Sequence, residues 1–262
     1  ILIEIQEIKI TLKPGQWSRW IRLDFPITGP AFIPTSHVSG ICRFYLMEGS
    51  PNFRLYCSPI NIDPSAPAVR ISEPPAFISD VSKQLGLFYT TGFQEDHKAR
   101  TNGIFNDEEF LRQAGYVLEE RLALLEYAIE NYEDGLLFFY FSSGDLQSHM
   151  FWWNSDEKHP TRTGPEAQRY FAHVKSLYRK LDSIIGELHD RYGGNATIIV
   201  MSDHGAKKMD GGITINEWLI NEGYLVLDEK PQGVVPLACS VWDQVFQNLS
   251  SANQTKVRVG VN

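Results

Sequence analysis

Alternating apolar and polar residues dominate the beginning of the chain. Ile1–Leu12 alternates for much of its length, and Trp17–Phe25 alternates again after a Pro-Gly pair. Gly40–Met47 and Phe53–Cys57 have a similar strand-like composition. A period of two is typical of strands with one buried face, and Pro followed by Gly suits a type II turn. The pattern predicts a small antiparallel β unit over residues 1–60, which we interpret as an insertion beside a larger sheet.

A proline-rich stretch follows this unit, over residues 58–76. Such a composition indicates a stiff, extended connector. Ala76–Gly86 is compatible with a short helix, and a polar loop follows, in which we assign no role to His97. We therefore divide the chain into the β unit, a connector with its loop over 61–105, and a core over 106–262.

Two long helices are predicted in the core. Asn106 and Glu109 can form a capping box at the start of the first, where acidic residues also suit the positive end of the helix dipole. Apolar residues then recur at intervals of three and four from Phe110 to Ile129, and the pattern predicts that the helix ends near Asp134-Gly135. The second helix opens with Pro165 in its first turn and ends at Gly193.

Each long helix leads into a short apolar run. Leu136–Phe141 is aromatic and aliphatic, and Thr197–Met201 is rich in β-branched residues. Such runs fit strands that are buried on both faces, as in a parallel sheet. Helix, strand, helix, strand is the order of βαβ units, so the pattern predicts an α/β core.

An aspartate and a histidine follow each run. Asp145 and His149 stand four residues apart, which places them on one face if the chain turns helical there. Asp203 and His204 directly follow Ser202 after the second run. Ligands bind outside the carboxyl ends of strands in open α/β sheets, and a carboxylate beside an imidazole suits a divalent metal. The alternative is that the aspartates cap helices and the histidines are ordinary polar loop residues; two such pairs together favour a metal site.

These motifs resemble those of the alkaline phosphatase superfamily, type I phosphodiesterase/nucleotide pyrophosphatase family, in its bacterial-type members. The resemblance rests on Asp145-Leu-Gln-Ser-His-Met-Phe-Trp-Trp, on Ser202-Asp-His-Gly, and on the Asn-Glu-Trp-Leu segment from Asn216. It implies an alkaline-phosphatase-like parallel (mixed) sheet flanked by helices, and hydrolysis of a small phosphodiester or nucleotide substrate.

The resemblance also implies two divalent cations, with zinc favoured over manganese. Asp145 and His149 would be ligands of one cation, and Asp203 and His204 would be ligands of the other. The family's remaining ligands are an upstream Asp, an upstream Thr or Ser that is also the nucleophile, and a downstream His. We match no residue of this chain to them and interpret the chain as a fragment with a core incomplete at both ends. We expect it to bind metal weakly or not at all and to be inactive by itself.

Charge and cysteine content narrow the partners. A net charge of −8 argues against nucleic acid or an anionic membrane as a partner, although bound cations can reverse the local field for a phosphate substrate. No apolar run approaches the length of a membrane span.

Cys42, Cys57 and Cys239 have no CxxC spacing; Cys42 and Cys57 could pair in an exported protein, and unpaired thiols are the alternative. The compartment, bacterial cytoplasm or periplasm, stays open, as does the oligomeric state.

Other functions fit the same motifs. A phosphomutase, sulfatase or phosphonate hydrolase relative would carry similar metal ligands, and a non-catalytic α/β interaction domain would need none. Outside the two motifs, we interpret His159 as a residue of an exposed turn. Lys207 and Lys208 could approach a phosphate, but a solvated loop is the simpler interpretation.

Overall fold

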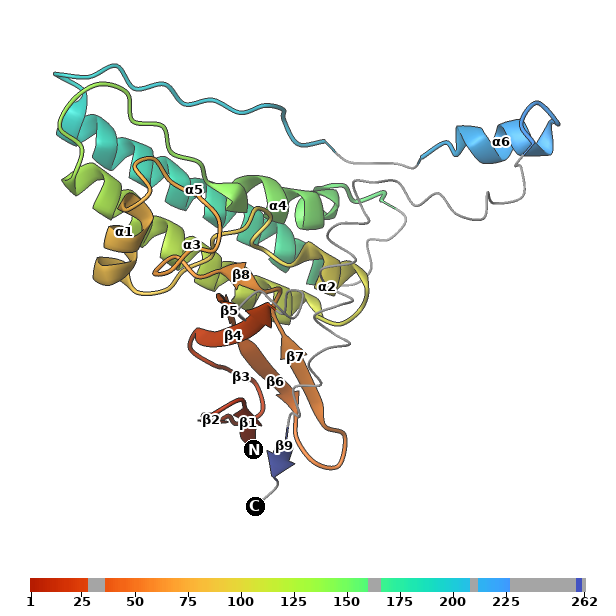
Figure 1. Ribbon diagram of the computed structural model, residues 1–262. Helices are drawn as coiled ribbons and strands as arrows, with labels where there is room; N and C mark the ends of the chain where they lie inside the picture. The colour runs from red at the N-terminus through yellow and green to blue at the C-terminus, as the bar shows by residue number, and fades with distance from the viewer. Residues whose placement is uncertain (28–35, 160–165, 208–211, 227–257, 261–262) are drawn as a thin grey trace. The chain divides into compact units, whose positions relative to one another are not determined.

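The computed structural model describes residues 1–27, 36–159, 166–207, 212–226 and 258–260. Contacts between Cα atoms divide the chain into two units. Figure 1 colours the chain by residue number from red to blue. One unit comprises Ile1–Thr91 with Thr214–Asn262, and the other comprises Gly92–Ile213. The boundaries predicted at residues 60 and 105 stay predictions.

Within the described residues of the first unit lie three small antiparallel sheets, as the alternating pattern predicts. In spatial order, the first contains β2 (Ile8–Thr11), β1 (Leu2–Ile5) and β9 (Arg258–Gly260); the second contains β3 (Gln16–Trp17), β6 (Phe44–Glu48) and β7 (Arg54–Cys57); the third contains β4 (Ile21–Ile27), β5 (Ser36–Cys42) and β8 (Asn61–Ile62). The longest pairing joins β4 to β5, from Ile21 opposite Cys42 to Ile27 opposite Ser36.

Inward-facing side chains of these strands form one apolar cluster. It includes Ile3, Cys42, Phe44 and Leu46, all of them buried. Trp17 stacks on Tyr45 with ring centroids 4.9 Å apart, and both side chains are buried, so this pair forms part of the core. Cys42 and Cys57 are free thiols. Within its described residues, the unit also carries α1 (Phe77–Leu85), where the sequence is compatible with a short helix, and α6 (Ile215–Asn221).

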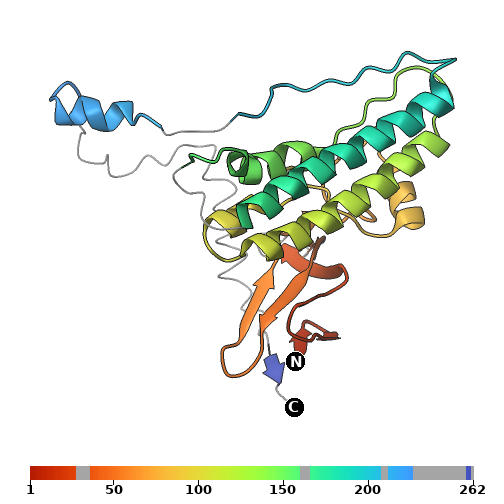
Figure 2. The same cartoon turned by 180° about the vertical axis from the view of Figure 1, so that it is seen from behind.

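The second unit is helical. It contains α2 (His97–Thr101), α3 (Asp107–Glu130), α4 (Ser142–Phe151), the 3-10 helix η1 (Trp152–Ser155) and α5 (Glu166–Tyr192). Helices α3, α4 and α5 lie side by side in both views (Figures 1 and 2). Between them, Phe151 stacks on Tyr170 with centroids 5.1 Å apart and lies 5.9 Å from the ring of Phe110. These aromatic contacts anchor α4 against both long helices.

The start of α3 is the capping box that the sequence predicts. The side chain of Asn106 accepts a hydrogen bond from the backbone N–H of Glu109, and the Glu109 carboxylate accepts one from the N–H of Asn106, each at 2.9 Å. Both groups satisfy amides that a helix leaves without partners in its first turn. None of the described helices combines the length and the apolar character that crossing a bilayer demands.

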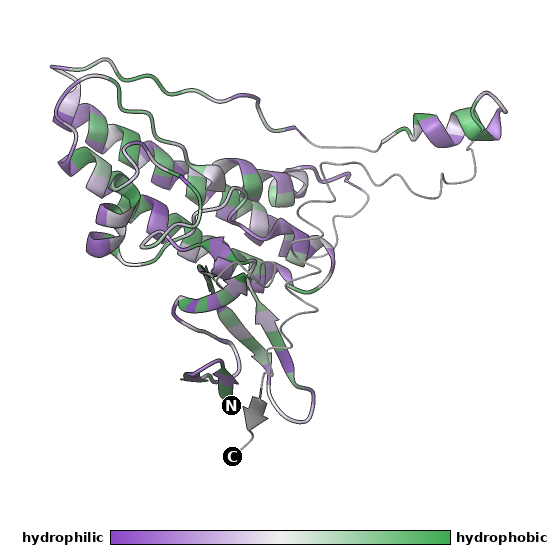
Figure 3. Ribbon diagram, viewed as in Figure 1, coloured by the Kyte–Doolittle hydropathy of each residue, from purple (hydrophilic) through white to green (hydrophobic). Residues whose placement is uncertain are grey.

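The two predicted core strands are not formed in the described residues. Leu136–Phe141 and Thr197–Met201 are extended segments without strand pairing, and Leu136 and Ile199 are 91% and 77% exposed. In Figure 3, the ribbon has the colour of hydrophobic residues along much of both segments. The described residues thus form a mixed α/β structure with antiparallel sheets and no parallel sheet. Apolar composition favours a strand, but pairing needs a neighbour, which a sequence pattern does not supply.

Candidate metal centre

Helix α4 places the first motif on one helical face. The chain enters the helix from an extended residue, Phe141, and Ser142 begins the first turn. Asp145 and His149 lie one turn apart, with His149 Nε2 3.2 Å from Asp145 Oδ1. The structure therefore has the helix that the four-residue spacing predicts, and the spacing brings a hard oxygen donor beside a nitrogen donor.

His204 joins this pair from a different part of the chain, the extended segment after α5. Its Nε2 atom lies 3.6 Å from Asp145 Oδ1, and its ring centroid lies 5.7 Å from that of His149. One ligand atom from each of the three residues lies within 4.8 Å of the other two. We call Asp145, His149 and His204 the metal cluster.

The spacing within this cluster fits a divalent cation. Nitrogen and oxygen ligands lie ~2.0–2.2 Å from zinc, which puts two ligands of a tetrahedral site about 3.3 Å apart. The two distances at Asp145, 3.2 and 3.6 Å, bracket that value. The cluster is open to solvent, because the side chains of Asp145, His149 and His204 are 29%, 58% and 53% exposed. Such openness leaves room for water or a substrate oxygen.

A family model for type I phosphodiesterase / nucleotide pyrophosphatase matches residues 36–258. The chain belongs to this family. Its members are typically hydrolytic enzymes and are generally metal-dependent. No match was found among the curated proteins or among the solved structures.

In this phosphodiesterase-family chain, Asp203 lies beside the metal cluster. Its Oδ2 atom is 3.7 Å from His204 Nε2, and its Oδ1 accepts a hydrogen bond from the backbone N–H of His204 at 3.1 Å. The Asp203 side chain is 86% exposed. The structure thus groups His204 with Asp145 and His149, and the assignment of Asp203 and His204 to a second cation stays a prediction.

The field around the cluster is negative. Burial raises the pKa of Tyr140, and the charges of Asp145, Asp203 and Glu95 raise it further, while Arg121 opposes them. Carboxylates that disfavour a phenolate also favour a nearby cation. The sequence motifs did not single out Tyr140, although it stands at the end of the apolar run that leads to α4.

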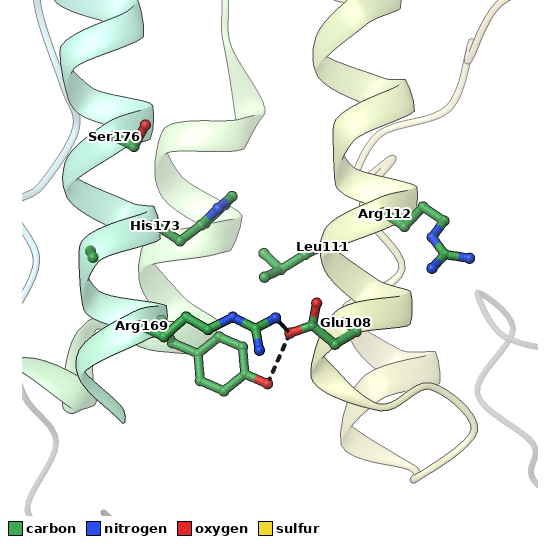
Figure 4. A pocket seen from close by; sticks show the side chains of 8 residues that line it. Glu108, Leu111, Arg112, Arg169, His173 and Ser176 are labelled. Carbon is green, nitrogen blue, oxygen red and sulfur yellow. Dashed lines mark hydrogen bonds and ion pairs between the residues drawn. The ribbon is translucent and has the colours of Figure 1, made fainter. Parts of the chain in front are cut away.

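A groove of about 550 Å³ lies elsewhere in the helical unit, between α3 and α5 (Figure 4). There, Glu108 forms an ion pair with Arg169 and accepts a hydrogen bond from the Tyr170 hydroxyl. Burial and nearby acidic residues raise the pKa of Tyr170 to about 12. None of the four predicted ligands lines this groove. The pairing of Glu108 with Arg169 and Tyr170 joins the two helices across it, so we interpret the groove as part of the helix packing.

The remaining candidate residues lie outside the metal cluster. The His97 ring contacts Phe93, and the His159 ring lies 5.4 Å from that of Trp153. Lys207 is exposed, and Lys208 lies outside the described residues.

Proposed function

We propose that this chain supplies metal ligands to a hydrolase that cleaves phosphodiester or nucleotide pyrophosphate bonds in small substrates. The observation that supports this most is the meeting of His204 with Asp145 and His149, which two separate motifs of the chain contribute. An interaction module would have no need for an open set of two imidazoles and a carboxylate in a negative field.

The roles of the chain's own residues follow from their chemistry. Asp145 would bind through a carboxylate oxygen, and His149 and His204 through neutral ring nitrogens. A divalent cation held there supplies Lewis-acid stabilisation of the charge on a phosphoryl group. Zinc is the best match for two nitrogens and an oxygen, and manganese is the second candidate.

The proposal includes a second cation. Asp203 lies next to His204 and has an exposed carboxylate, so together they would hold a cation beside the first, with His204 oriented toward one or the other. Two neighbouring cations can stabilise the attacking and the leaving oxygen of a phosphoryl transfer. The family's nucleophilic hydroxyl is assigned to no residue of this chain.

Zinc titration by calorimetry tests the binding part. We expect the chain to bind zinc more weakly than closed four-ligand sites do, because the cluster offers three protein ligands and is exposed. Asp145→Asn should abolish the heat of binding, whereas Asp182→Asn, an exposed acid on α5, should leave it unchanged. Equal binding by both variants would overturn the proposed site.

Turnover of a chromogenic phosphodiester by the native protein tests the reaction. Asp145→Ala and Asp203→Ala should each lose turnover while the far-UV spectrum and the unfolding midpoint stay those of the parent, and Asp182→Ala should keep it. Unchanged turnover in both variants would favour the non-catalytic interpretation.

A further inference from the structure

A buried carboxylate lies beneath the first turn of α4. Glu95 is wholly buried, and its two oxygens accept hydrogen bonds from the first two residues of the helix. Ser142 Oγ donates to Oε2 at 2.9 Å, and Ser143 Oγ donates to Oε1 at 2.6 Å. Both serines are themselves buried. The carboxylate therefore binds two successive residues at the same helix end.

The segment that carries Glu95 is fixed from its other side by α3. Gln113, which is buried on α3, accepts a hydrogen bond from the Asp96 N–H at 3.0 Å and donates one to the Gln94 carbonyl at 2.8 Å. Asp96 also caps α2 by accepting from the Ala99 N–H. Glu95 is therefore held on both sides in sequence, and its carboxylate has little freedom to move.

Burying an ionisable group such as Glu95 costs free energy, so we looked for a function that its carboxylate performs. Burial raises the pKa of Glu95, whereas the two serine hydroxyls and the charge of Arg121 on α3 lower it. The positive end of α4 also favours an acid at this position. A carboxylate offers a separate acceptor oxygen to each of the two hydroxyls, whereas an amide offers one acceptor oxygen and an apolar side chain offers none. The geometry thus uses the acid's two oxygens as a clamp.

The clamped turn is the one that presents the metal cluster. Asp145 follows Ser143 by two residues, and His149 lies one turn further along α4. We propose that Glu95 is a positioning residue for the metal centre, which sets the place of Asp145 and His149 by clamping Ser142 and Ser143 to α3. The inference rests on the proposed function. A ligand pair placed by a rigid helix end retains its spacing only while that end is fixed.

The test compares Glu95→Gln with Glu126→Gln, an exposed glutamate on α3 that provides the matched control. We expect Glu95→Gln to weaken zinc affinity about tenfold, in the range that partners outside the ligand set contribute. The visible absorption spectrum of the cobalt-loaded chain should change as well, since it reports ligand geometry. Glu126→Gln should match the parent in both measurements.

Ser143→Ala gives an independent route if Glu95→Gln fails to fold. It removes one hydroxyl from the clamp, and we expect weaker zinc binding and a shifted cobalt spectrum in a variant that still folds, with an unfolding midpoint below that of the parent because buried Glu95 loses a donor. In a double-mutant cycle the losses from Glu95→Gln and Ser143→Ala should not add, because they break one clamp. Parent-like affinity and spectrum in either folded variant would overturn the inference.

Hydrogen exchange separates this inference from the proposed function. If the parent chain binds neither zinc nor cobalt, the proposed function fails, and the amides of α4 decide the clamp. Faster exchange confined to α4 in Glu95→Gln, with α5 unchanged, would support the clamp without a metal. Parent-like exchange in α4 would overturn it.

Discussion

His204 Nε2 lies 3.6 Å from Asp145 Oδ1 on α4, although η1 and α5 lie between the two residues along the chain. The contact joins two motifs that are otherwise far apart in sequence. If it marks a shared cation, His204→Asn should reduce zinc affinity at least about tenfold, since partners outside the ligand set already contribute that much.

His189→Asn provides the control for that substitution, because His189 is exposed on α5 and pairs only with its neighbour Asp190 among the interactions described. Its zinc affinity should equal that of the parent. Calorimetric titration of the two variants side by side measures the difference, and equal affinities would remove His204 from the site.

The buried Glu95 carboxylate predicts a pH dependence of stability. Burial raises its pKa in the folded chain above the ordinary value of 4.5, against the hydroxyls of Ser142 and Ser143 and the charge of Arg121. A group with a raised folded pKa contributes stability that is fully present below the unfolded pKa and is lost as pH rises through the folded pKa.

Urea unfolding of the parent and of Glu95→Gln over this range checks the sign. The free energy of unfolding of the parent should fall relative to the variant as pH rises above 4.5. Glu126→Gln, which changes an exposed side chain on α3, is unfolded beside them as the control for the substitution itself. A difference that grows in the parent's favour with rising pH would contradict the assignment.

Removing the capping box of α3 should lower the stability of the folded chain. Asn106→Ala removes the acceptor for the Glu109 N–H and should cost about 1 kcal/mol in the free energy of unfolding. Asn106→Asp should cost little, because aspartate caps helices about as well as asparagine. Denaturant titrations of the two variants measure the contrast, and equal losses would show that the cap contributes nothing.

Asp63 predicts the opposite pH behaviour in the sheet unit. The pKa of the Asp63 carboxyl is lowered below its ordinary value of 3.8. Burial alone would raise this pKa, but hydrogen bonds from Ser65, Arg22 and Ser39 stabilise the charged form and outweigh burial. Its stabilising contribution is therefore present above the unfolded pKa and is lost as pH falls through the folded pKa.

Asp63→Asn should cost about 2 kcal/mol at neutral pH, because partners are left without their acceptor. The deficit should shrink in acid, which urea unfolding at two pH values would record. Asp24→Asn, an exposed acid on β4, is the matched control and should change stability little. An equal deficit in both variants would place the effect on net charge instead of on the Asp63 bonds.

Local signals predicted the helices well. The Asn106 box, the apolar spacing of α3 and α5, and the four-residue step from Asp145 to His149 all depend on neighbours within a few residues, so the sequence contains them directly. Strand pairing depends on distant partners. Leu136–Phe141 and Thr197–Met201 have strand-like composition, yet they stay unpaired within the described residues.

The candidate site shows the same contrast between local and distant signals. Asp145, His149, Asp203 and His204 carry recognisable spacing, and the sequence places both motifs after similar apolar runs. Glu95 was not predictable, because it stands in a polar stretch that indicates a solvated loop. Its burial arises from the packing of α3 and α4 around residues 94–96, which is a tertiary property.

The exposed apolar segments around Ile199 and Leu136 affect how readily the chain associates with itself. An extended backbone with bare amides and a row of aliphatic side chains is a template on which another molecule can lay a strand. Electrostatic repulsion from the acidic surface opposes such self-association and weakens as salt screens it. Turbidity of the purified chain should accordingly rise with ionic strength.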